Sequence, residues 1–159
     1  LVLDRVRDPG NLGTILRTAW AAGVDLVLLA PETADPFNPK VVRAGMGAHF
    51  HVPIVSAAWE ELADRFASYP RVYLADAASA PSAGARSYKD VDWARPLVLI
   101  IGGEAEGAST QAEALAGTTV AIPMPGSAES LNAAVAAGIL LFEAVARGHA
   151  DMRDSGSHP

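Results

Sequence analysis

The stretch LVLIIGGEAEG, which spans residues 97–107, decides the fold class of this chain. Its first five residues form the strongest apolar run in the sequence, and Gly102 and Gly103 follow directly. A short apolar run bounded by glycines is typical of a strand buried on both faces of a parallel sheet. Glycines after such a strand let the backbone approach a ligand closely. We therefore expect a buried strand at 97–101 and a candidate binding loop after it.

Outward from this strand, apolar runs and helical spacings alternate along the whole chain. Such alternation predicts an α/β fold, with a mostly parallel sheet and helices on both faces. The expected strands are residues 1–3, 25–30, 52–55, 71–75, 97–101 and 118–122. The expected helices are residues 12–22, a segment opened by Asn38 and Pro39, 56–68, a short helix after Ser109, and 130–147. Residues 77–95 predict a long connection with room for one short helix.

Polar residues at the expected helix starts predict the caps. Asn11, Ser56, Ser109 and Ser130 stand where an N-cap side chain accepts a backbone hydrogen bond. For Ser130, capping is the structural alternative to a role in a ligand site. Gly148 predicts the end of the last helix.

The composition indicates one folded domain. Of 159 residues, 50% are hydrophobic and 19% are charged, which excludes a disordered chain. No apolar run approaches the roughly 20 residues that span a bilayer, and no signal-peptide pattern opens the chain. Cysteine is absent, and His49 and His51 lack a third ligand at metal spacing. We expect a cytoplasmic protein without metal, disulfide or membrane partner.

The net charge of −6 argues mildly against nucleic acid, since phosphate binding is dominated by Lys and Arg. A local basic patch can still bind RNA on an acidic protein. Five basic residues gather in the first third of the chain: Arg5, Arg7, Arg17, Lys40 and Arg43.

In a parallel sheet, ligands bind at the carboxyl ends of the strands, which directs attention to three loops. The first, DRVRDPGNLGTILR at residues 4–17, follows a strand and opens a helix. A helix N-terminus attracts anions, and Arg17 lies where it can grip a phosphate bidentately. The residue types alone favour the alternative of a solvated arginine and a structural Asn11, because arginine is mostly exposed.

The second loop carries Glu104 and Glu106 beside its glycines. These carboxylates would repel a polyphosphate, and they fit a ligand with hydroxyls and positive charge, such as a ribose or a sulfonium. The Walker pattern and the dinucleotide glycine spacing are absent. A tight glycine turn with two solvated glutamates is the structural alternative.

The third loop reads IPMPGSAESLN at residues 122–132. Apolar Ile122, Met124 and Leu131 could pack on a purine whose edge nearby backbone groups could read. Ser130 and Asn132 are polar at the mouth of an otherwise apolar helix.

Together the three loops resemble the signature of the SpoU/TrmH branch of the SPOUT methyltransferases. The matching motifs are DPGNLG at 8–13 followed by Arg17, IGGEAEG at 101–107, and IPM at 122–124 with SLN at 130–132. The resemblance runs from residue 1 to about 147. It implies a deep C-terminal trefoil knot, an obligate homodimer, and transfer of a methyl group from S-adenosylmethionine to a ribose 2′-hydroxyl of RNA. Ribosomal RNA is the expected substrate.

The resemblance also implies roles for individual residues. Gly102, Gly103, Ile122, Met124, Leu131 and Asn132 would line the cofactor site, largely through backbone. Arg17 would act on the 2′-hydroxyl, and Asn11, Glu104, Ser130 and Asn132 would shape the site around it. Because an arginine side chain ordinarily stays protonated, Arg17 would act either as a strongly perturbed base or as a group that holds the target phosphate and polarises the hydroxyl.

Three departures from the family pattern and three alternatives remain. Gly45, Gly103 and the pair Ala133–Ala134 stand where other residues are frequent. The alternatives are a transfer RNA substrate, methylation of a base nitrogen, and a non-catalytic RNA-binding or dimerisation module. We expect a catalytic domain at 1–150, a flexible tail at 151–159, and an N-terminal RNA-binding domain missing from this chain.

Overall fold

The strands and helices alternate as expected in the computed structural model, which describes residues 1–76, 84–103, 107–126 and 130–154. Seven strands form one sheet in the order β3-β2-β1-β6-β4-β7-β5, and every pairing between strands is parallel. The elements are β1 (Val2–Asp4), α1 (Pro9–Ala21), β2 (Val27–Leu29), α2 (Pro39–Gly45), η1 (Ala48–Phe50), β3 (Ile54–Ser56), α3 (Trp59–Phe66), β4 (Val72–Asp76), β5 (Arg86–Ser87), η2 (Tyr88–Asp90), β6 (Val98–Gly102), α4 (Thr110–Leu115), β7 (Thr118–Ala121) and α5 (Ala133–Asp154).

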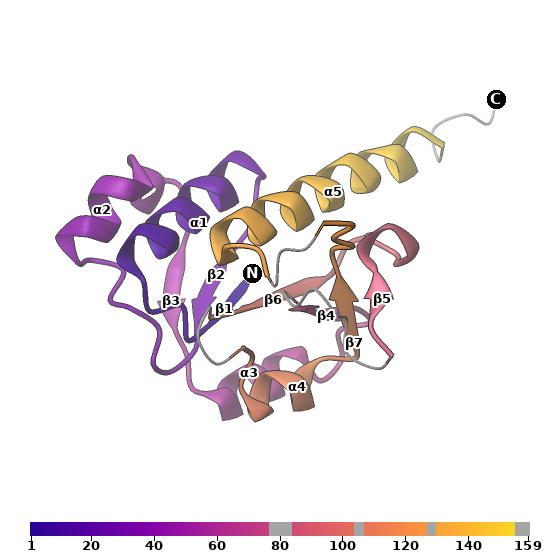
Figure 1. The fold of residues 1–159 in the computed structure, drawn as a ribbon, viewed down its shortest axis with the longest axis horizontal. Helices are drawn as coiled ribbons and strands as arrows, with labels where there is room; N and C mark the ends of the chain where they lie inside the picture. Colours follow the sequence, from indigo (N-terminus) through magenta and orange to yellow (C-terminus); the bar gives the residue numbers. More distant parts are fainter. Residues whose placement is uncertain (77–83, 104–106, 127–129, 155–159) are drawn as a thin grey trace.

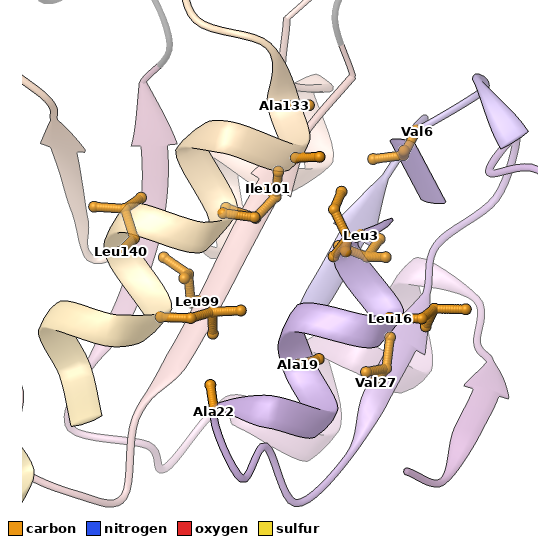
Figure 2. Packing of buried hydrophobic residues seen from close by; sticks show 14 of the residues in the cluster. Leu3, Val6, Leu16, Ala19, Ala22, Val27, Leu99, Ile101, Ala133 and Leu140 are labelled. Carbon is orange, nitrogen blue, oxygen red and sulfur yellow. The ribbon is translucent and has the colours of Figure 1, made fainter. Parts of the chain in front are cut away.

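The helices cover both faces of the sheet, as predicted. Helices α1, α2 and α5 lie on one face, and α3 and α4 lie on the other (Figure 1). Alternate residues of β6 point to the two sides: Leu99 and Ile101 pack in the cluster under α1 and α5, and Val98 and Ile100 pack in the cluster over α3 and α4. Figure 2 shows the first cluster filling the space between α1, α5 and the central strands. Burial on both faces explains the uninterrupted apolar run of this strand.

The predicted caps of α1 and α3 were both wrong. Asp8, not Asn11, caps α1, since Asp8 Oδ1 accepts the Asn11 backbone N–H at 2.7 Å. Ser56 belongs to β3, and α3 begins at Trp59. In both helices a neighbouring residue, Asp8 or Ala58, is the N-cap in place of the expected one.

The last helix differs from its prediction at both ends. It begins at Ala133 rather than at Ser130, and it continues through Gly148 to Asp154. Glycine costs helix stability but does not forbid a helix. The cap predicted at Ser109 is confirmed, because Ser109 Oγ accepts the Ala112 N–H at 3.2 Å.

The connection before β6 contains the short 3-10 helix η2, for which the prediction left room, and the two-residue strand β5, which no pattern predicted. Both are too short to produce a periodic signal. In the described part of the chain, no helix is long and apolar enough to cross a membrane.

Candidate functional site

The three predicted loops all leave the carboxyl ends of strands. Strands β1 and β6 are neighbours, and Asp4 pairs in register with Gly102 where they end. The first two loops therefore start side by side. The third loop follows β7, which lies beyond β4 in the sheet. This loop leads back toward α1. Residues from both ends of the chain therefore lie together at the carboxyl ends of the strands, which we call the carboxyl edge of the sheet.

Asn132 joins the third loop to the first. Its Oδ1 accepts the backbone N–H groups of Ala134 at 2.9 Å and Val135 at 3.3 Å, so Asn132 is the N-cap of α5. The cap fixes the orientation of the amide, because the oxygen must face the helix. Its Nδ2 is then directed at Asn11 Oδ1 and donates a hydrogen bond of 2.9 Å.

Asn11 can make this contact because it does not cap its own helix. Asp8 occupies the N-cap of α1 and Pro9 stands at the first helical position, where a missing N–H costs nothing. Asn11 is therefore inside the first turn, with its side chain available to Asn132. Sequence reasoning missed Asp8, although an Asp directly before a proline is a usable signal for a helix start.

Arg17 lies on α1, about 9 Å further along the helix axis than Asn11. Its side chain is exposed, and within the described part of the chain no hydrogen bond or ion pair holds it. The structure does not bring Arg17 into contact with Asn11 or Asn132. An exposed guanidinium beside a helix is nonetheless able to bind a phosphate.

The predicted cofactor residues fall into two groups. Gly102 ends β6, and a side chain at Gly103 would collide with the Arg5 backbone, since a Cβ there would lie 2.1 Å from the Arg5 carbonyl oxygen. Ile122, Met124 and Leu131 are half-buried in the loop after β7, and Ile122 packs against the main core. Glycine backbone on one side and apolar side chains on the other suit a nucleoside that is held between them.

Two further predicted residues have different outcomes. Ser130 is exposed and does not cap α5, so the structural alternative for it was wrong. Glu104 lies outside the described residues.

Two other features of the described residues do not indicate a different binding site. No group of three His, Cys, Asp or Glu side chains within them could hold a metal. An apolar cavity of about 520 Å³ opens at the amino ends of the strands, between Leu1, Leu26 and Leu97. Ligands of parallel sheets bind at the carboxyl ends of the strands, so this cavity is not part of the predicted site.

Comparison with known proteins identifies relatives over most of the chain. Residues 1–142 match the model of the SpoU rRNA methylase family. The 23S rRNA (guanosine(2553)-2′-O)-methyltransferase RlmP of Bacillus subtilis is 41% identical over 143 residues, which cover 89% of this chain and 56% of that enzyme.

Solved structures agree with the sequence matches. An AdoMet-bound rRNA methyltransferase from Sinorhizobium meliloti is 44% identical with a TM-score of 0.80, and the match covers 90% of this chain and 54% of that one. A structure described as giving insight into 2-OH methylation of C/U34 on tRNA is 30% identical with a TM-score of 0.79, and covers 94% and 95% of the two chains. The chain thus spans about half the length of the first two relatives and nearly all of the third.

Proposed function

The chain belongs to the SpoU rRNA methylase family, and on that premise we propose that it transfers a methyl group from S-adenosylmethionine to a ribose 2′-hydroxyl of RNA. The observation that carries the proposal is the hydrogen bond between Asn11 and Asn132, which joins the first and third motif loops at one edge of the sheet. Ribosomal RNA is the proposed substrate, since the Bacillus subtilis relative acts on 23S rRNA by its name.

The residues at this edge fit S-adenosylmethionine. Gly102 and Gly103 offer backbone without side chains, and a Cβ at Gly102 would already lie 3.1 Å from the Ala108 nitrogen. Half-buried Ile122, Met124 and Leu131 would hold the adenine. When bound, the cofactor supplies a methyl group on a positively charged sulfur. Support for this ligand comes from the AdoMet-bound relative of Sinorhizobium meliloti.

The protein must orient a ribose hydroxyl and relieve it of its proton, because a neutral hydroxyl is a weak nucleophile. We assign Arg17 to the phosphate next to the target ribose, from which its guanidinium can polarise the hydroxyl, and the hydroxyl proton leaves to bulk water. The exposure of Arg17 supports this role over that of a base, which would require a desolvated guanidinium. Asn11, Asn132, Ser130 and Glu104 complete the proposed site.

We further propose a homodimer. Helix α5 exposes Val135 and Phe142, each about 50% accessible, and their spacing of seven residues places them on one face. The neighbouring α1 exposes Trp20 at 40%. Apolar side chains on one helix face are typical of a protein interface.

The trefoil knot is a proposal of the same kind. Helix α5 follows β7, yet it packs on α1 and β6, so the chain must return across the sheet. We propose that this return forms the trefoil knot. The catalytic unit would then comprise residues 1–150, and we propose that the enzyme is cytoplasmic.

Transfer RNA is the second candidate substrate. The relative associated with tRNA methylation matches this chain over 95% of its own length. Assays with tritiated S-adenosylmethionine on ribosomal and transfer RNA, followed by mapping of the methylated nucleotide, test both candidates. Titration calorimetry with S-adenosylmethionine tests the cofactor separately, and absence of binding would overturn the proposed function. Ligand at a hundredfold excess over its Kd should stabilise the fold by roughly 2.7 kcal/mol.

A further inference from the structure

Arg5, the residue directly after β1, has an unusual backbone conformation. Its φ is 55°, in the left-handed region that side chains with a Cβ rarely adopt. Such a conformation persists only where the surroundings hold it in place. The contacts of Arg5 show what holds it.

Arg5 touches both described ends of the glycine loop. Its Nη2 donates a hydrogen bond of 3.1 Å to the Gly107 carbonyl oxygen. Its own carbonyl oxygen lies against Gly103, where a Cβ would approach to 2.1 Å. Gly103 and Gly107 are in turn joined as an antiparallel bridge. The residue with the left-handed φ therefore contacts the loop at its entry and at its exit.

Asp4 adds a second link between the same segments. Its carboxylate is completely buried, and its Oδ2 accepts the Ser109 backbone N–H at 2.6 Å. The other oxygen, Oδ1, lies 3.7 Å from Arg5 Nε. A buried carboxylate needs a compensating charge, and the Arg5 guanidinium, whose side chain is only 18% exposed, provides it.

We propose that Arg5 is a positioning residue, which holds Gly103 and Gly107 in the positions that allow S-adenosylmethionine to bind. The inference rests on the proposed function, because it assigns this loop to the cofactor. Arg5 acts through the loop and does not touch the reacting atoms. Its removal should therefore raise the Kd and KM for S-adenosylmethionine while kcat is retained.

Arg5→Lys is the decisive variant. Lysine keeps the positive charge near Asp4 but cannot bond Gly107 and face Asp4 with a planar fork. Loss of one hydrogen bond from a charged donor predicts a Kd for S-adenosylmethionine that is up to about tenfold higher, with a smaller fall in Tm than in Arg5→Ala. Arg5→Ala should weaken binding further, and it should also lower the Tm because the Asp4 carboxylate loses its compensating charge.

Arg95→Lys is the matched control. Arg95 Nη2 also donates a hydrogen bond of 3.1 Å to a glycine carbonyl, that of Gly23, at the far edge of the sheet. This variant should leave the Kd for S-adenosylmethionine unchanged.

Calorimetry, steady-state kinetics and thermal denaturation of the purified chain separate the outcomes. A raised Kd and KM with kcat retained in Arg5→Lys supports the inference. A wild-type Kd in Arg5→Lys overturns the inference and leaves the proposed function standing, as does a lowered Tm at an unchanged Kd. Failure of the wild-type chain to bind S-adenosylmethionine overturns the proposed function, and the inference with it.

Discussion

Asn132 Nδ2 donates a hydrogen bond of 2.9 Å to Asn11 Oδ1, which ties the N-cap of α5 to the first turn of α1 across 121 positions of sequence. One amide thus serves two purposes: its oxygen caps a helix, and its nitrogen fixes a second helix relative to the first. The two purposes can be separated by substitution, since carboxylate and amide share the acceptor but not the donor.

Asn132→Asp should retain the cap of α5 and lose the bond to Asn11, whereas Asn132→Ala should lose both. We expect Asn132→Ala to lower the free energy of unfolding by about 1 kcal/mol more than Asn132→Asp does. A double-mutant cycle with Asn11→Ala, measured by urea denaturation, should give a coupling energy of about 0.5–1.5 kcal/mol. Strict additivity of the two alanine variants would contradict the link between the helices.

Arg17→Ala should abolish methyl transfer and leave both the Tm and the Kd for S-adenosylmethionine unchanged. The side chain is exposed and has no partner among the described residues, so its loss costs the fold nothing. Arg17→Lys separates the two chemical roles, because lysine loses its proton more readily but holds a phosphate less specifically. A low residual rate that does not rise with pH supports phosphate positioning. Retained turnover in Arg17→Ala, followed with a tritiated methyl group, would remove Arg17 from the mechanism.

The sequence predicted the layers of the fold because apolar spacing depends only on which faces are buried. The strand at 97–101 is the clearest case, with four of its residues buried in two different clusters. The position of Asn11 inside α1 was missed, although Asp8 directly before Pro9 is a local signal for the cap. The sequence could not predict the partner of Asn132, since no local pattern records a contact over such a separation.

Gly13→Ala and Gly148→Ala should change stability in opposite directions, although both glycines are in helices. Alanine is the better helix former by about 0.5–1 kcal/mol, so propensity alone favours both substitutions. At Gly13, however, a Cβ would lie 2.5 Å from the Ala44 Cβ and 2.6 Å from the Val41 carbonyl oxygen, because α1 and α2 pack closely there. At Gly148 a Cβ meets nothing within 4 Å.

We therefore expect Gly13→Ala to lower the free energy of unfolding by about 1–3 kcal/mol through overpacking, and Gly148→Ala to raise it slightly. Urea denaturation measures both. Equal stabilisation by the two substitutions would mean that α1 and α2 are not in close contact.

Asp92 should contribute stability that is lost in acid. The backbone N–H of Ala94 and the guanidinium of Arg71 both donate hydrogen bonds to its carboxylate and hold its pKa below the ordinary value of 3.8. A pKa that is lower in the folded state gives stability that is fully present above pH 3.8 and lost as the pH falls through the folded value. The Tm of the wild type should therefore fall more steeply below about pH 4 than that of Asp92→Asn. Asp64→Asn, on the exposed side of α3, controls for the loss of one carboxylate, and identical acid profiles of all three proteins would contradict the contribution of Asp92.

Phe142→Glu should convert the proposed dimer into a monomer. Phe142 and Val135 lie on one exposed face of α5, and a charge at the centre of an apolar interface leaves an uncompensated buried carboxylate. Val55→Glu is the matched control, since Val55 is exposed to a similar degree, 48%, but lies on the edge strand β3. Light scattering after size-exclusion chromatography should find a monomer for Phe142→Glu alone, with methyl transfer lost if each active site needs its partner. A wild-type chain that elutes as a monomer would contradict the dimer, and an active monomeric variant would show that one chain holds a complete site.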